Sequence, residues 1–141
     1  MQCELAETDA AIMDCFRTLA ELRPHVPEQD FLVRIRRQQQ AGYQLACLRE
    51  EGEVQAVAGF RLAESLAWGK YMYVDDLVSR SAVRSRRYGQ ALFDWLIQLA
   101  RDRGCAAVHL DSGVQNFGAH RFYLRNRMVI SSHHFKLSLT D

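Results

Sequence analysis

The sequence predicts an α+β domain built around a mixed β-sheet, and two features of the chain lead to this prediction. Side chains at residues 43–48 and 53–62 alternate between two faces, as in the strands of a β-hairpin. Farther along, apolar runs at 71–78 and 105–111 enclose an amphipathic helix over residues 88–103. A strand, a helix and a strand in this order form a crossover, which makes the two strands parallel.

Two helices are predicted before the hairpin. The first covers residues 9–22, with Thr8 or Asp9 as its N-cap, and it turns Ile12, Cys15, Phe16 and Leu19 inward. The second runs from Pro27, which suits the first position of a helix, to about Gln40. Its inward residues are Phe31, Leu32 and Ile35, and its outward residues are Arg34, Arg36 and Arg37.

The hairpin and strand 71–78 make an antiparallel meander of three strands, with Glu50-Glu51-Gly52 as the first turn. The helix over 88–103 buries one face, which consists of Tyr88, Leu92, Trp95, Leu96 and Leu99. A short helix over 116–125 then precedes a second hairpin, formed by Met128–Ile130 and His134–Leu139.

Composition argues against several classes of function. Eighteen basic and seventeen acidic residues give a net charge of +1, so no global attraction draws the chain to nucleic acid. No apolar run is long enough to span a membrane, and no signal peptide is visible. The cysteines are scattered at Cys3, Cys15, Cys47 and Cys105, which disfavours disulfides and a metal site and fits a reducing cytoplasm. One domain over 1–141 is expected, with Trp68 and Trp95 in its core.

Four arginines lie between strand 71–78 and the helix that follows it: Arg80, Arg84, Arg86 and Arg87, close to Gly89. A loop that leads into a helix N-terminus offers unpaired backbone N–H groups and the positive end of the helix dipole. Guanidinium groups add two-pronged recognition of phosphate. This segment is therefore predicted to bind a polyphosphate ligand.

A second motif follows the predicted crossover, where Asn116, Ala119, Phe122 and Tyr123 stand as Asn-x-x-Ala-x-x-Phe-Tyr. With the arginine loop and the order of elements, it makes the chain resemble the GNAT N-acetyltransferase superfamily, in its small bacterial single-domain members. The resemblance implies a mostly antiparallel central sheet with one splayed parallel strand pair, flanked by helices. It covers nearly the whole chain and is most specific from Val74 to Phe135.

In the superfamily the loop has the sequence pattern Arg/Gln-x-x-Gly-x-Gly/Ala, and this chain can be aligned with that pattern in two registers. Arg86-x-x-Gly89-x-Ala91 matches the letters. Arg84-x-x-Arg87-x-Gly89 is preferred, because it places apolar residues where the family usually has them and is spaced more usually from the strand. Arg87 then replaces the first glycine of the motif, and Arg127 replaces a glycine before the methionine that follows. An arginine at a glycine position is expected to be strained or to crowd the cofactor.

The ligand that the resemblance implies is acetyl-CoA, or a related acyl derivative of coenzyme A. Its pyrophosphate would lie on the backbone amides of Arg84, Ser85, Arg86, Arg87, Tyr88, Gly89 and Gln90. Its pantetheine arm would bond the backbone at Leu77 and Ser79, and a backbone N–H near Val78 would meet the thioester oxygen. Asn116 would bond the cofactor or an ordered water, the alternative being a plain N-cap.

Three residues are predicted to carry the chemistry. Asp75 or Asp76 would act as the base for the amine, and only one of the two is expected to face the substrate, since neighbours on a strand point to opposite sides. Tyr123 matches the family's general acid by position. The alternatives are sheet-end carboxylates that bond the backbone and an aromatic residue packed in the core. His109 is interpreted as a core residue and His120 as a surface one.

The resemblance implies an acyl-CoA-dependent N-acetyltransferase that acts on a primary amine of a small molecule or peptide. The alternative is a noncatalytic acyl-CoA-binding or interaction module on the same fold, suggested by Arg87 and Arg127. Binding of nucleic acid through the arginine loop is the weakest hypothesis, because no stacking aromatic residues accompany the loop. Homodimers are common in the superfamily, so a homodimer is left open.

Overall fold

The computed structural model describes residues 1–141, with every side chain except that of Ser85. The chain forms two compact units, Met1–His109 and Leu110–Asp141, and each is described by itself.

A five-stranded sheet organises the fold, with the order β1-β2-β3-β4-β5. Its strands are β1 (Gln2–Leu5), β2 (Tyr43–Glu50), β3 (Glu53–Ser65), β4 (Gly69–Ser79) and β5 (Ala107–Leu110). The first four strands pair antiparallel in sequence order, and the crossover from β4 through a helix to β5 gives one parallel pair. The predicted mixed sheet, hairpin and meander are therefore confirmed.

Strand β1 is an element that the sequence analysis missed. It holds only four residues, and it forms because β2 supplies a backbone partner, with Cys3 opposite Leu48 and Leu5 opposite Ala46. The amide of Ala6 extends the pairing to the carbonyl of Leu45 over 2.8 Å. Alternation of Cys3 and Leu5 with polar neighbours is too short a pattern to indicate a strand on its own.

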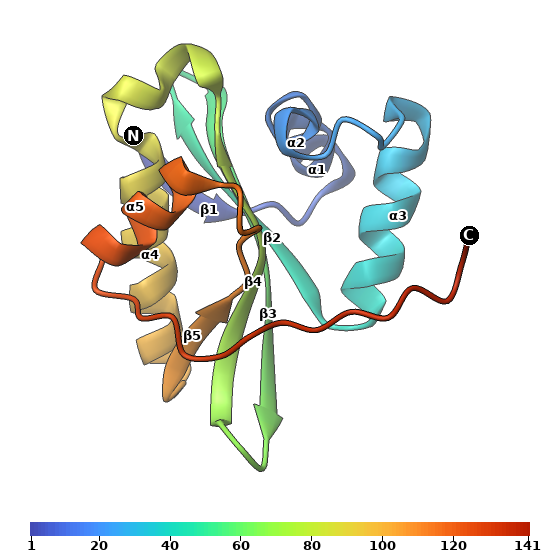
Figure 1. Cartoon of the computed structure of the whole chain (residues 1–141). Helices are drawn as coiled ribbons and strands as arrows, with labels where there is room; N and C mark the ends of the chain where they lie inside the picture. The colour runs from blue at the N-terminus through green and yellow to red at the C-terminus, as the bar shows by residue number, and fades with distance from the viewer. The chain divides into compact units, whose positions relative to one another are not determined.

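Helices cover both faces of the sheet in the unit Met1–His109, with α1, α2 and α3 on one side and α4 on the other (Figure 1). Their bounds are Asp9–Asp14, Phe16–Leu22, Glu28–Gln40 and Tyr88–Asp102. Thr8 caps α1 as predicted, because its Oγ1 accepts a hydrogen bond from the Ala11 amide over 3.1 Å. The predicted single helix over 9–22 is two helices, since the chain turns tightly at Cys15, whose amide bonds the carbonyl of Ile12.

The two sides of the sheet have separate apolar layers. The layer under α1, α2 and α3 includes Ile12, Leu19, Phe31, Ile35, Tyr43, Leu45, Val57 and Val78. Helix α4 buries Tyr88, Leu92, Phe93, Leu96 and Ala100. The predicted face is confirmed at Tyr88, Leu92 and Leu96, whereas Trp95 and Leu99 are only half-buried, so Trp95 is not a core residue. Complete burial of a leucine stabilises the fold by ~1.5–3 kcal/mol.

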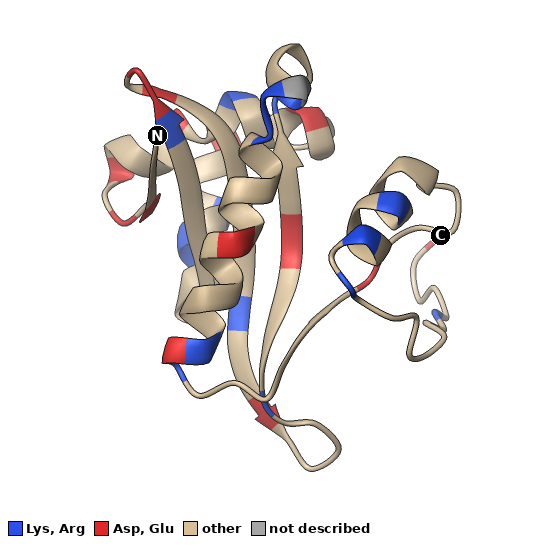
Figure 2. Ribbon diagram, turned by 90° about the vertical axis from the view of Figure 1, so that its left-hand side faces the viewer, with Lys and Arg blue, Asp and Glu red and all other residues tan. Residues whose placement is uncertain are grey.

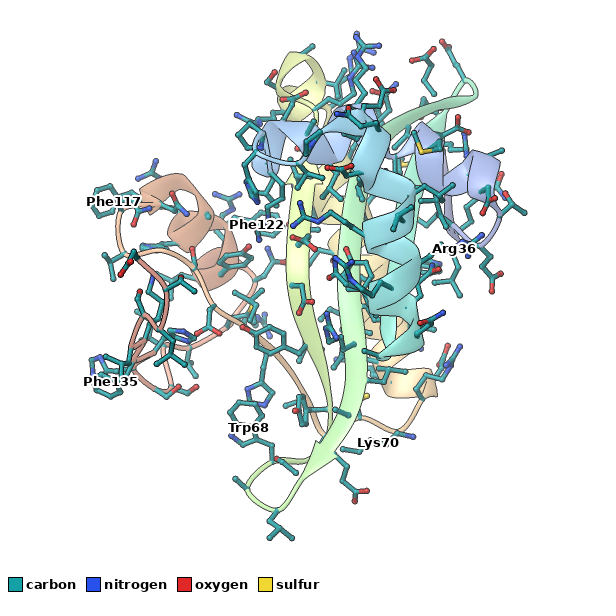
Figure 3. The ribbon with its side chains drawn as sticks, turned by 90° about the vertical axis from the view of Figure 1, so that its right-hand side faces the viewer. Arg36, Trp68, Lys70, Phe117, Phe122 and Phe135 are labelled. Atoms are coloured by element: carbon teal, nitrogen blue, oxygen red, sulfur yellow. The ribbon has the colours of Figure 1, made fainter. Side chains whose placement is uncertain are left out.

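Trp68 is not a core residue, contrary to the prediction, because 44% of it is exposed in the turn between β3 and β4 (Figure 3). One ring face is covered by His109, whose ring stacks on it with 3.8 Å between centroids. His109 is thus in contact with an aromatic ring, but its Nε2 has no hydrogen-bond partner in the part of the chain that is described.

The unit Leu110–Asp141 contains one helix, α5 (Phe117–Arg125), followed by an irregular tail. The predicted hairpin of Met128–Ile130 and His134–Leu139 is wrong, since the chain after α5 forms no strand in the described structure. Phe135, Leu137 and Leu139 do alternate, but they are 85–91% exposed. Alternation only permits a strand, and a ladder of backbone hydrogen bonds is needed to form one.

Candidate active site

A β-bulge in β4 positions the two predicted carboxylates. Gly59 of β3 pairs with Asp76, and Phe60, the next residue, pairs with Val74, so Asp75 is an extra residue in the ladder. Val74 therefore faces α4, whereas Asp75 and Asp76 both face α1, α2 and α3. The expectation that these two neighbours point to opposite faces is wrong, because strict alternation stops at the bulge. Figure 2 shows the acidic band partway along this strand.

Asp76 is held by two donors. The Tyr43 hydroxyl donates to its Oδ2 over 2.8 Å, and Arg23 Nε donates to its Oδ1 over 2.9 Å. Burial, followed by the charge of Asp76 and the hydrogen bond to it, raises the pKa of Tyr43 far above its ordinary value, which keeps the phenol a donor at physiological pH. The carboxylate of Asp76 thus has a fixed orientation at the centre of the sheet.

Asp75 belongs to the same polar network. Arg61 Nε donates to its Oδ2 over 2.8 Å, and the Arg61 guanidinium lies 5.4 Å from the centre of the Tyr43 ring. Arg23 links the two positions, because its Nη2 donates to the backbone carbonyl of Asp75 over 3.1 Å. The sequence analysis had assigned no role to Tyr43, Arg61 or Arg23, since only the tertiary fold brings them to the carboxylates.

A cavity of about 160 Å³ opens beside Asp76, between α2, the segment 23–26, α3 and the sheet. Its apolar lining is Phe16, Leu19, Ala20, Val26, Phe31 and Ile35. Tyr43, Arg23 and Arg34 add polar groups to the wall. Arg34 was predicted to face solvent, but it lines this cavity. The arrangement can hold a small molecule with an apolar body against a fixed carboxylate.

The arginine loop forms a short 3-10 helix, Ser81–Arg86, that leads directly into α4. Arg84, Ser85 and Arg86 belong to the 3-10 helix, Arg87 is the N-cap, and Tyr88, Gly89 and Gln90 form the first turn of α4. The Arg87 side chain makes no capping hydrogen bond. Within the described residues, no carboxylate lies within ion-pair distance of Arg84, Arg86 or Arg87, whereas Arg80 lies 3.7 Å from Glu53.

Arg87 has a left-handed backbone, with φ 65° and ψ 24°. Glycine adopts this conformation without steric cost, so the observation supports the register that places Arg87 at the family's first glycine. Arg127 also has positive φ, 67°, and it ends α5: its amide bonds the Leu124 carbonyl, and the Met128 amide bonds the Tyr123 carbonyl. This is the Schellman arrangement, in which glycine is usual. The positive φ of Arg127 is thus explained by the way in which α5 ends.

The end of β4 lies next to the start of α4. A Cβ atom on Gly89 would lie 3.6 Å from Oγ of Ser79, so the helix comes close to the strand terminus. The amide of Ala106 bonds the Lys70 carbonyl over 2.7 Å, which places β5 beside the beginning of β4. With only four residues, β5 ends well before Leu77, Val78 and Ser79. Within the unit Met1–His109, this stretch of β4 therefore lacks a strand on its β5 side.

Glu21 on α2 approaches the same loop, where its Oε1 accepts a hydrogen bond from the Ser81 amide over 3.0 Å. Burial works to raise the pKa of this carboxyl, but the bonds from Ser81 and the charges of Arg84 and Arg80 outweigh burial and lower it. Glu21 therefore stays ionised and orders the first turn of the loop.

Tyr123 and Asn116 belong to the second unit. Tyr123 lies on α5, and burial raises the pKa of its phenol, which keeps it protonated at neutral pH. Asn116 is the N-cap residue of α5 by position, yet its side chain makes no capping hydrogen bond. His120 has a ring nitrogen 2.7 Å from the Gly113 carbonyl, so Nε2 donates there and the ring has a structural contact.

Among the described side chains, no three His, Cys, Asp or Glu residues gather as a group of metal ligands. None of the helices in the described structure combines the length and the apolar character needed to cross a bilayer.

The mixed sheet thus contains a bulged strand, β4, whose end leads through the arginine loop into helix α4. The chain belongs to the acetyltransferase (GNAT) family, whose model matches residues 7–127. It is 32% identical over 111 residues to an uncharacterized N-acetyltransferase, YhdJ, of Bacillus subtilis strain 168, with 78% of each protein covered.

Solved structures agree with this fold. A ribosomal-protein-alanine N-acetyltransferase from Brucella melitensis biovar Abortus 2308 superposes with a TM-score of 0.84 at 14% identity, covering 99% of this chain and 100% of that one. Glucosamine-6-phosphate N-acetyltransferase from Arabidopsis thaliana gives 0.75 at 20% identity, with the same coverage. At such identities the similarity establishes the fold alone.

Proposed function

We propose that this chain, as a single domain over residues 1–141, transfers an acetyl group from acetyl-CoA to a primary amine of a small molecule or peptide. The observation that carries the proposal is the alignment of three features along β4. They are the carboxylates of Asp75 and Asp76, the second of which lines a cavity, the edge of β4 that has no neighbouring strand within the unit Met1–His109, and the arginine loop at the end of β4.

The residues present fit coenzyme A. The backbone amides from Arg84 to Gln90 and the helix dipole would hold its pyrophosphate. Arg84, Arg86 and Arg87 supply positive charge and form no ion pair in the described structure, while the Glu21 carboxylate lies near Arg84. The edge of β4 at Leu77 and Ser79 would bond the pantetheine amides as a neighbouring strand would. The backbone N–H near Val78 would bond the thioester oxygen and stabilise the oxyanion that develops there.

The reaction requires a neutral amine. An alkyl amine with a pKa of about 10.4 is neutral in only about one molecule in several thousand at pH 7. A carboxylate at Asp75 or Asp76, directly or through a water, would take the proton as the amine nitrogen attacks the thioester carbon. The N–C bond would form as the C–S bond breaks, and the Tyr123 hydroxyl would give its proton to the departing thiolate. Of the two carboxylates, Asp76 is the one that lines the cavity.

Calorimetric titration of acetyl-CoA, followed by a thiol-release assay with a panel of amines, tests the proposal. We expect saturable binding, and turnover that falls at least tenfold in Asp76→Asn and Asp75→Asn. Arg87 in a glycine position favours the alternative of a noncatalytic acyl-CoA-binding module, and binding without turnover over a broad panel would support that alternative. Absence of binding would overturn both.

A further inference from the structure

The cavity beside Asp76 carries an unbalanced charge. Arg23 pairs with Asp76, and Arg61 pairs with Asp75, so each of these carboxylates already has a guanidinium partner. Arg34 also lines the cavity, from α3, and in the described structure no carboxylate lies within ion-pair distance of it. The side chain of His25 lines the same space. The cavity therefore holds one cation more than its own acidic groups neutralise.

The other two arginines near Arg34 on α3 do not line the cavity without an ion pair as Arg34 does. Arg36, two residues on and labelled in Figure 3, donates to Asp9 over 2.6 Å and to the Glu7 carbonyl over 3.0 Å. Arg37 is exposed to solvent and does not line the cavity. Of these three arginines, Arg34 is the one that lines the cavity, and it forms no ion pair in the described structure. A half-buried guanidinium in such a position favours an anionic partner.

We propose that the acceptor amine carries a carboxylate, so that the substrate is a small amino acid with an apolar side chain. This inference rests on the proposed acetyl transfer and specifies its acceptor. The carboxylate would pair with Arg34, the apolar body would contact Phe16, Phe31 and Ile35, and the amine would lie toward Asp76. Arg34 on α3 and Asp76 on β4 line the same cavity, so a ligand held there can meet both a cation and a carboxylate.

The volume and charge of the cavity disfavour several other classes of amine. About 160 Å³ is well below the several hundred Å³ of pockets that bind drug-sized ligands, so a folded peptide segment does not fit inside. A polyamine would bring further positive charges next to Arg23 and Arg34, which is unfavourable at short distance. A simple alkyl amine fills the apolar part but leaves Arg34 without a partner. An aminoalkyl phosphate would supply an anion, and it is an arm of the test.

The test measures binding without acetyl-CoA, so that it does not depend on turnover. Calorimetry compares L-leucine with its decarboxylated analogue 3-methylbutylamine, with spermidine and with 2-aminoethyl phosphate. The proteins are wild type, Arg34→Gln and the matched control Arg37→Gln, which removes an exposed arginine from the same helix. Far-UV circular dichroism checks that all three are folded.

We expect wild type to bind L-leucine at least about tenfold more tightly than 3-methylbutylamine, as a charge-assisted pair provides. Arg34→Gln should abolish that preference, and Arg37→Gln should keep it. Equal binding of the two ligands, tighter binding of spermidine or the phosphate, no binding of L-leucine, or an unchanged preference in Arg34→Gln would each overturn the inference. If the inference failed but other amines still released thiol, the proposed function would stand. If L-leucine bound but no amine released thiol, the inferred binding would stand and the proposed acetyl transfer would fail.

Discussion

The hydroxyl of Tyr43 on β2 reaches across β3 and donates a hydrogen bond to Oδ2 of Asp76 on β4, over 2.8 Å. The residue of β3 that it crosses is Gly59, which pairs with Leu45 on one side and Asp76 on the other. A Cβ atom at position 59 would overlap the ring of Tyr43. The absence of a side chain in the middle strand thus allows the outer two strands to share a hydrogen bond.

Gly59→Ala should displace the Tyr43 ring and break its bond to Asp76. We expect the free energy of unfolding to fall by about 1–3 kcal/mol, as for other overpacked cores, and thiol release to decline with it. Urea denaturation measures the first effect. Gly89→Ala is the control, because a Cβ there meets Ser79 at an ordinary distance and alanine favours the helix by about 0.5–1 kcal/mol. Equal stability of Gly59→Ala and wild type would contradict the prediction.

Alkaline pH should reveal the burial of Tyr43. Its pKa is raised in the folded protein, so its contribution is fully present below about pH 10 and is lost as pH rises further, when only the unfolded chain releases the proton. Tyr43→Phe should be less stable at pH 8 by about 1 kcal/mol. Above pH 10 the stability of Tyr43→Phe should fall less steeply than that of wild type, and the two slopes should differ by up to about 1.4 kcal/mol per pH unit. Urea denaturation from pH 8 to 11 tests this, with Tyr71→Phe as the control; parallel curves for wild type and Tyr43→Phe would refute it.

Tyr123→Phe should lower kcat by about 10²–10⁴, the usual contribution of a general acid, and leave the affinity for acetyl-CoA nearly unchanged. Burial raises the pKa of Tyr123, so the wild-type enzyme should keep its proton donor up to at least pH 10. Steady-state thiol release across this pH range provides the measurement. Turnover that survives the substitution would remove Tyr123 from the mechanism.

Arg87→Gly should relieve a left-handed backbone conformation at the start of α4. The expected gain in stability is about 1 kcal/mol, and coenzyme A should bind more tightly if Arg87 occupies the family's glycine position. Arg127→Gly is a matched control, since it relieves the same conformation at the end of α5, outside the loop. It should stabilise the fold without changing the affinity for coenzyme A. Unchanged affinity in Arg87→Gly, measured by calorimetry, would count against the preferred register.

Local patterns predicted the sheet, the crossover and the arginine loop because each depends on neighbours in the sequence. Apolar residues recur every second position in β2 and β3, and every third or fourth position in α4. The left-handed position of Arg87 followed from comparing its place in the motif with a glycine. These features need no knowledge of what packs against them.

Other features depend on contacts between distant segments, and no local pattern contains them. The bulge at Asp75 arises from pairing with β3, so the sequence of β4 alone suggested regular alternation. Arg34 lies on the polar side of α3 by periodicity, yet it lines a cavity together with residues of the segment 23–26. The C-terminal alternation indicated a strand, which requires a partner ladder that the described tail does not have.

The bulge also has a consequence for how the site can vary. Asp75 is surplus to the ladder, so omitting it would leave Val74 on the α4 side and Val78 on the opposite side, where both lie now. The packing of the two apolar layers does not depend on which side chain stands at position 75. A sequence can therefore exchange the carboxylate at this position, or lose it, without having to redesign the protein interior.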